Sequence, residues 1–253
     1  MQLSLQGKSV LVTGSSRGIG RAIGEAFLAE GSQVAFNGRN LSDLDLIVAL
    51  NSDGKAIAIC GDVSKPDQAS HVIKQALEAF GQLDILICNV GNGRSVPPGA
   101  EFYAEWQRVF EQNLWTTTNM VEASREALSQ TQGAIVCISS ICGQEVIDGA
   151  PITYSVAKAA LNAYVRGIAR PLGKDGIRIN AIAPGNIIFD GSIWQRKLVE
   201  DPISVEQMLH RDVALAKLGT PKDMANLALW LASPAASFCT GSIFVADGGQ
   251  VHS

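Results

Sequence analysis

Short apolar runs rich in β-branched residues alternate along the chain with longer segments whose apolar residues recur at helical spacing. Runs of the first kind are typical of buried strands, and the three-to-four-residue repeat is typical of amphipathic helices. The pattern predicts strands at residues 9–13, 33–37, 56–61, 83–88, 134–139, 178–183 and 243–246. It predicts helices at residues 18–30, 42–50, 66–80, 102–128, 152–172 and 221–231.

This alternation predicts an α/β fold, because each helix carries the chain back to begin a strand parallel to the previous one. We expect a doubly wound, mostly parallel, Rossmann-like sheet with helices on both faces, as a single domain over residues 1–253. The sequence has no internal repeat and no linker rich in Pro, Gly or Ser. Residues 186–220 lie outside the alternation, and a long insertion after a strand is typical of a substrate lid.

The chain is slightly acidic, and its charged residues are dispersed. Among 253 residues, 47% are hydrophobic and 17% charged, and the formal net charge is −4. No cluster of Lys and Arg favours a nucleic-acid partner. No stretch has the ~18 consecutive apolar residues of a membrane span. The N-terminus has no apolar signal-peptide core, so we expect no membrane association and a cytoplasmic location.

The residues that most often bind metals are scattered. The five cysteines form no C-x-x-C pair, and the three histidines, His71, His210 and His252, lie far apart in the chain. Ligands of a structural or catalytic zinc site usually come in short-range pairs. We therefore predict no metal site.

A glycine-rich segment joins the first predicted strand to the first predicted helix. Residues 13–20 read TGSSRGIG. Glycines allow the backbone to turn tightly there and to approach a pyrophosphate, and the N-terminus of the following helix offers free N–H groups. The segment therefore predicts a dinucleotide site.

The G-x-x-x-G-x-G spacing of this segment resembles that of the short-chain dehydrogenase/reductase family, and further motifs extend the resemblance over nearly the whole chain. They are, in chain order, Asp62-Val63, the N-V-G turn of residues 89–91, Asn113, Ser139-Ser140, the Y-x-x-x-K motif of Tyr154 and Lys158, Pro184-Gly185, Thr240-Gly241 and the D-G-G of residues 247–249. The chain is most similar to the 3-oxoacyl-thioester reductase-like and the sugar- or polyol-dehydrogenase-like members. The resemblance implies a small carbonyl or alcohol substrate and a homo-oligomer, expected to be a tetramer with 222 symmetry or a dimer. It implies helix pairing through residues 102–128 and 152–172, and a second contact through the last helix and strand.

The resemblance also implies which residues contact the nicotinamide cofactor. These are Gly14, Ser16, Arg17, Gly18, Ile19, Gly20, Arg39, Asp62, Val63, Asn89, Gly91, Tyr154, Lys158, Pro184, Gly185 and Ile187.

The end of the second strand bears on the choice of cofactor. An acidic residue there binds the ribose 2′-hydroxyl of NAD and repels the 2′-phosphate of NADP. This chain has Gly38 at that place, followed by Arg39, whose guanidinium suits a phosphate. Arg17 in the glycine segment is a second cation for the same group. We predict NADP(H) in preference to NAD(H).

Tyr154 and Lys158 lie four residues apart in a predicted helix and therefore one turn apart on one face. A free Tyr has a pKa of ~10, and one nearby cation lowers such a value by ~1–3 units, to roughly 7–9. A phenol in that range suits general acid–base catalysis. By resemblance, Tyr154 exchanges the proton of the carbonyl or alcohol, and Lys158 lowers the phenol pKa and holds the ribose.

Two further catalytic roles come from the resemblance alone. Ser140 hydrogen-bonds the substrate oxygen, with Ser139 as the alternative. Asn113 provides a backbone carbonyl for a water that links Lys158 to solvent. No G-x-S-x-G elbow surrounds either serine, so a serine hydrolase is not favoured.

The chain departs from the family pattern at Phe189. Many relatives have a Thr there that contacts the nicotinamide carboxamide, which Phe cannot do through a hydrogen bond; the backbone of Ile187 is the substitute that we expect. Three other functions stay open. They are an NAD-dependent sugar or polyol dehydrogenase, a non-catalytic nucleotide-binding module, and an epimerase or dehydratase, although the last usually has a larger substrate domain.

Overall fold

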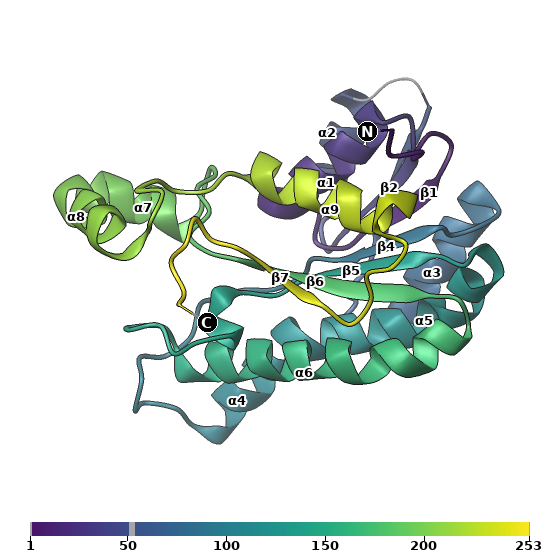
Figure 1. Cartoon of the computed structure of the whole chain (residues 1–253). Helices are drawn as coiled ribbons and strands as arrows, with labels where there is room; N and C mark the ends of the chain where they lie inside the picture. Colours follow the sequence, from purple (N-terminus) through teal and green to yellow (C-terminus); the bar gives the residue numbers. More distant parts are fainter. Residues whose placement is uncertain (1, 51–53, 253) are drawn as a thin grey trace.

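A seven-stranded sheet with all strands parallel forms the centre of the molecule (Figure 1). The computed structural model describes residues 2–50 and 54–252, so residues 1, 51–53 and 253 of the predicted domain lie outside the described residues. The strands are β1 (Ser9–Val12), β2 (Gln33–Gly38), β3 (Ala56–Cys60), β4 (Ile85–Cys88), β5 (Ala134–Ile138), β6 (Arg178–Pro184) and β7 (Ile243–Ala246). Their order across the sheet is β3-β2-β1-β4-β5-β6-β7, which confirms the doubly wound, Rossmann-like fold.

Helices cover both faces of the sheet, and each face has its own hydrophobic core (Figure 1). One face is covered by α1 (Gly18–Ala29), α2 (Leu41–Leu50) and α9 (Pro221–Ala232); the other is covered by α3 (Pro66–Phe80), α5 (Thr116–Thr131) and α6 (Ile152–Lys174). Along β1, Leu11 joins the second core while Val10 and Val12 join the first. Burial on both faces explains why the strands are continuous apolar runs.

The predicted continuous α-helix over residues 102–128 is wrong in its middle. The chain forms α4 (Tyr103–Phe110), then a π-helical turn, η1 (Glu111–Trp115), and then α5. Within η1, the Asn113 side chain donates a hydrogen bond to the Val109 carbonyl (3.0 Å). A π turn keeps the chain helical and changes the spacing by one residue only, so the apolar periodicity does not reveal it.

The predicted lid contains two helices, α7 (Ile193–Glu200) and α8 (Pro202–Asp212), which lie apart from the two helical layers in Figure 1. Ser192 caps α7 by accepting a hydrogen bond from the Gln195 N–H, and Asp201 caps α8 in the same way. Two short 3-10 helices, η2 (Ile141–Gly143) and η3 (Pro234–Ala236), complete the described chain. Within the described residues, no helix combines the length and apolar character needed to cross a membrane.

Candidate active site

The predicted site residues meet at one edge of the sheet because the strands that carry them are all parallel. From β1, the sheet continues through β2 and β3 on one side and through β4 to β7 on the other. The switch point between β1 and β4 leaves a crevice at the carboxyl ends of the strands. The glycine segment follows β1, Asn89 and Gly91 follow β4, and Ser140 follows β5. The sheet therefore brings the motifs together although they are far apart in sequence.

Glycines in the segment after β1 permit close packing against the residues that follow β4. Asn89 donates from its side-chain amide to the carbonyls of Thr13 (3.1 Å) and Gly14 (2.9 Å). A Cβ at Gly14 would lie 3.0 Å from Val90 Cγ2, and a Cβ at Gly20 would overlap the Asn89 amide. The Asn89 side chain thus holds the glycine segment against the end of β4, a structural role that the family pattern alone did not specify.

The first turn of α1 has N–H groups that suit an anion. Arg17 is its N-cap and provides no side-chain acceptor for the first N–H groups, and the first turn has no acidic residue. Because the first-turn N–H groups of a helix have no intrahelical partners, they and the helix dipole favour a phosphate. Gly18, Ile19 and Gly20 form that turn, so the residues present fit the pyrophosphate of a dinucleotide.

The segments after β2 and β3 form the part of this edge that would face the adenosine end of a dinucleotide. Arg39 and Arg17 are both exposed, and Gly38 leaves the end of β2 without a side chain. A Cβ at Gly38 would make only ordinary contact with Leu44, at 3.5 Å. Asp62 accepts a hydrogen bond from the Ser64 N–H (3.1 Å), while the Val63 side chain lies in the core, which leaves only its backbone for a ligand.

The two residues of the Y-x-x-x-K motif lie one turn apart on α6, as the spacing predicts. Lys158 Nζ lies 5.9 Å from the centre of the Tyr154 ring and donates a hydrogen bond to the Ile138 carbonyl (2.8 Å). Lys158 is buried, and Tyr154 is only partly exposed. The Ile138 bond holds the ammonium next to the end of β5, two residues before Ser140.

The expected lowering of the Tyr154 pKa is not what the protein's own groups produce. Burial raises the pKa of Tyr154 to about 12, opposed by a hydrogen bond with Ser140. Burial also lowers the pKa of Lys158 to about 8. Each shift has the same cause, because a site with little water disfavours the charged form of either group. The charge of Lys158 can be read from the sequence, whereas the burial of both residues, which has the larger effect, cannot.

The two candidate serines have different surroundings. Ser139 is buried and donates its hydroxyl proton to Asn162 Oδ1 (2.6 Å). Ser140 accepts a hydrogen bond from the Cys142 N–H (3.2 Å), and its hydroxyl is the one that interacts with the Tyr154 phenol. The geometry therefore favours Ser140 as the serine of the site.

Asn113 joins the π turn to the loop after β4. Its Oδ1 accepts from the Asn92 N–H (2.9 Å), and its Nδ2 donates to the Asn92 carbonyl (3.1 Å). A Cβ at Gly91 would lie 3.0 Å from Lys158 Nζ and 3.1 Å from Asn113 Oδ1. Gly91 is therefore the small residue that allows Asn113 and Lys158 to approach each other.

Pro184 ends β6, and Gly185 packs against the C-terminal segment. The Gly185 N–H donates to the Ala246 carbonyl (3.1 Å), and a Cβ at Gly185 would lie 2.7 Å from Asp247 Cβ. Ile187 is buried and pairs with Gly219 in an isolated bridge. These contacts hold both ends of the lid at the carboxyl edge.

Two further features lie near Tyr154. A Cβ at Gly93 would lie 3.8 Å from the Tyr154 ring and 4.0 Å from Ile193 of the lid, so residue 93 belongs to the wall of the site. The buried Glu105 accepts from Ser95 (2.7 Å), and Ser95 is bonded to Thr153 (2.6 Å), the neighbour of Tyr154. Gly93 belongs to the loop after β4, which borders the pocket in the family, whereas no local pattern in the sequence pointed to Glu105.

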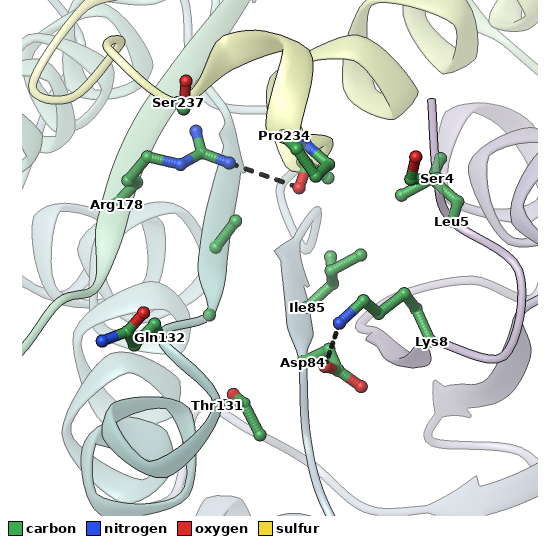
Figure 2. Close-up of a pocket in the computed structure, with 13 residues that line it drawn as sticks. Ser4, Leu5, Lys8, Asp84, Ile85, Thr131, Gln132, Arg178, Pro234 and Ser237 are labelled. Atoms are coloured by element: carbon green, nitrogen blue, oxygen red, sulfur yellow. Dashed lines mark hydrogen bonds and ion pairs between the residues drawn. The ribbon is translucent and has the colours of Figure 1, made fainter. Parts of the chain in front are cut away.

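A separate cavity of about 200 Å³ lies at the opposite edge, beside the amino ends of β4, β5 and β6 (Figure 2). Asp84 in its wall accepts from Lys8 Nζ (2.8 Å), Ser9 N–H (2.9 Å) and Gln82 Nε2 (2.9 Å). Arg178 donates to carbonyls at the end of α9, among them that of Leu231 (2.9 Å). These charged groups form their hydrogen bonds within the protein and hold the amino-terminal edge of the sheet together.

Comparison with known proteins agrees with the fold and the motifs. A family model described as enoyl-(acyl carrier protein) reductase matches residues 14–251. The chain belongs to the short-chain dehydrogenase/reductase family. Within it, the 3-oxoacyl-[acyl-carrier-protein] reductase of Synechocystis is 33% identical over 98% of this chain and 98% of its own length.

Solved structures show the same architecture with both nicotinamide cofactors. A 7α-hydroxysteroid dehydrogenase complexed with NADH and 7-oxo glycochenodeoxycholic acid matches with a TM-score of 0.91 and 30% identity, over 100% of this chain and 97% of that one. The L-sorbose reductase of Gluconobacter frateurii, complexed with NADPH and L-sorbose, matches with a TM-score of 0.92 and 27% identity, over 100% of both chains. Relatives of this fold therefore bind either dinucleotide.

Proposed function

We propose that the protein is an NADP(H)-dependent oxidoreductase that interconverts a carbonyl group and a secondary alcohol. The observation that carries the proposal is the group formed by Ser140, Tyr154 and Lys158 at the same edge of the sheet as the first turn of α1. The phenol interacts with the Ser140 hydroxyl, and the ammonium lies one helical turn away. A non-catalytic nucleotide-binding module has no need of this arrangement.

Each residue of the group has a defined part. Ser140 hydrogen-bonds the carbonyl oxygen and stabilises the charge that develops on it. Tyr154 gives its proton to that oxygen during reduction and takes it back during oxidation. Lys158 holds a positive charge next to the phenol and donates to the ribose, and the Asn113 backbone holds the water that links Lys158 to solvent. The nicotinamide, when bound, supplies or accepts the hydride.

The choice of dinucleotide rests on the end of β2. Gly38 stands where an acid would select NAD(H), Arg39 follows it directly, and Arg17 in the glycine segment is a second exposed guanidinium group. Contacts to the pyrophosphate come from the first turn of α1. Gly14, Ser16, Asp62, Asn89, Gly91, Pro184, Gly185 and Ile187 line the rest of the expected cofactor site.

A cofactor titration tests this choice. Because Gly38 leaves room for an acid, we expect Gly38→Asp and Arg39→Asp each to weaken NADPH binding by roughly 10- to 100-fold, the ~1.5–3 kcal/mol of a charge-assisted hydrogen bond. NADH binding should change little or improve. The matched control is Arg21→Asp, which changes an arginine paired with Glu25 on α1. Equal turnover of wild-type protein with NADH and NADPH would contradict the preference.

The substrate can be found by a screen. Purified protein is mixed with NADPH and with β-ketoacyl thioesters, ketoses, oxosteroids or small diketones, and loss of reduced cofactor is followed by absorbance. Net loss with a carbonyl compound supports the reductase. Conversion of a substrate with no net change in cofactor would indicate an epimerase or dehydratase instead.

We also propose a homo-oligomer, a tetramer with 222 symmetry or a dimer. Large apolar side chains are exposed on the expected pairing surfaces: Trp115 on η1, Val156 on α6, and Phe238 and Val245 near the C-terminal strand. Exposed apolar patches mark interaction surfaces. The five free thiols fit the reducing cytoplasm that we expect.

Light scattering tests the assembly. We expect about four or two times the chain mass of 26.7 kDa. If the assembly is a tetramer, Phe238→Ser should weaken the second contact and give dimers. A monomer mass at micromolar concentration contradicts the proposal.

A further inference from the structure

Phe189 lies in the first turn of the lid, directly over the glycine segment. Its backbone is fixed by the cap of α7: the Phe189 N–H donates to Ser192 Oγ (3.2 Å), and the Ser192 N–H donates to the Phe189 carbonyl (2.9 Å). Ser192 is itself buried. The position of Phe189 is therefore set by the hydrogen bonds that begin the lid helix.

The Phe189 ring packs on Gly18, the first residue of α1. A Cβ at Gly18 would lie 2.7 Å from ring atom Cε2, 2.8 Å from Cζ and 3.0 Å from Cδ2. The next residues of the lid follow the same course, because a Cβ at Gly191 would lie 3.8 Å from Arg17 Nη1. The lid thus passes beside Arg17 and Gly18, and the aromatic ring makes the closer contact.

The Phe189 ring lies beside the turn that would hold a pyrophosphate. Gly18 begins the turn of α1 whose N–H groups have no intrahelical partners and no side-chain cap. A ring that lies against Gly18 occupies space on the Cα side of that turn. A Thr, which many relatives have at this place, would be smaller and polar.

We propose that Phe189 is a determinant of dinucleotide affinity, because its ring must leave Gly18 before the pyrophosphate can reach the first turn of α1. This inference rests on the proposed function, since it assumes a dinucleotide ligand. When only a fraction of the molecules have the ring displaced, the observed Kd exceeds the intrinsic one by the inverse of that fraction. A smaller residue 189 removes this penalty.

The test is a binding measurement that needs no substrate. NADPH and NADH are titrated into wild-type protein and into Phe189→Leu and Phe189→Thr variants, with Kd taken from cofactor fluorescence and association rates from stopped flow. We expect Kd to fall in the order Phe, Leu, Thr, by about tenfold in total, with a matching rise in the association rate. Val199→Thr, at an exposed position of α7, is the matched control and should leave both unchanged.

The outcomes separate the two proposals. If wild-type protein binds neither dinucleotide, the proposed function and this inference both fail. If wild-type protein binds NADPH and the Phe189 variants bind it equally or more weakly, only the inference fails. Hydrogen exchange of residues 14–20 in the free protein gives a second readout: it should quicken in Phe189→Thr, and unchanged exchange would also count against Phe189 as the cover of the segment.

Discussion

At the scale of residues, burial shifts the pKa values of Tyr154 and Lys158 in opposite directions. Tyr154 and Lys158 lie close together at the end of β5, and burial favours the neutral form of each. The phenol therefore keeps its proton, which suits donation to a carbonyl oxygen. The ammonium is easier to deprotonate than in water, so Lys158 rather than Tyr154 sets the upper pH limit of reduction.

The pH dependence of activity follows from these two shifts. Lys158 is charged below its pKa of about 8, so kcat/KM for reduction should be level at lower pH and fall above about 8. Oxidation requires the phenol to lose its proton, so its rate should increase with pH towards the Tyr154 pKa of about 12. Both profiles are measured with the substrate found in the screen.

A charge-retaining variant provides the control for this prediction. The guanidinium of Lys158→Arg stays protonated over the whole range, so the fall in reduction near pH 8 should disappear even if the maximum rate is lower. A fall at the same pH in both proteins would assign that titration to another group.

At the scale of elements, hydrogen bonds join α4, the loop after β4 and α6 around the site. Arg108 donates to the Glu105 carboxylate (2.6 and 2.8 Å), and the Ser95 hydroxyl donates its only proton to the same carboxylate. The bond between Ser95 and Thr153 must then come from the Thr153 hydroxyl. This chain of bonds fixes the loop that contains Gly93 against the start of the catalytic helix.

Removing the carboxylate should loosen this connection. Glu105→Gln leaves part of a buried hydrogen-bonded network without its charged partner, which costs about 1–3 kcal/mol of unfolding free energy at pH 7. The Arg108 and Ser95 hydrogen bonds lower the pKa of Glu105 from 4.5 to about 2. Because the pKa of Glu105 is lower in the folded protein than in the unfolded chain, the carboxylate contributes its full stabilisation above about pH 4.5. That stabilisation is lost as the pH falls towards 2.

Urea unfolding of wild-type protein and of Glu105→Gln from pH 7 to pH 2 measures the size of the stability difference and the direction in which it changes with pH. The difference in stability should be full at pH 7 and shrink between about pH 4.5 and 2. Glu78→Gln, in an exposed pair with Lys74, is the control and should change stability by less than about 0.5 kcal/mol. A difference that grows in acid would contradict the assigned role of the carboxylate.

At the scale of the whole molecule, the fold could be predicted because its two determinants are local. Apolar runs such as residues 134–139 and 178–183 mark strands buried on both faces, and parallel pairing requires the helices between them. Parallel strands bring their carboxyl ends to one edge, which is why motifs from Gly14 to Ile187 could be placed in one site. Ser140, Tyr154 and Lys158 meet there as the spacing indicates.

What could not be predicted depends on contacts between distant segments. The π turn at Asn113 adds one residue to a helix without disturbing its apolar stripe. The contact of Phe189 with Gly18 depends on how the lid returns over the sheet. Burial around Tyr154 comes from several elements at once, and it raises the phenol pKa where the charge of Lys158 alone predicts a lower one.

The most direct test of the central claim is the effect of Tyr154→Phe on turnover and on cofactor binding, measured on the same preparation. The variant lacks only the hydroxyl that gives its proton to the carbonyl oxygen. We predict that kcat for carbonyl reduction falls by roughly 10²–10⁴-fold, the usual contribution of a general acid, while the Kd for NADPH stays within about twofold. Near-wild-type turnover in this variant would show that another group supplies the proton and would contradict the account.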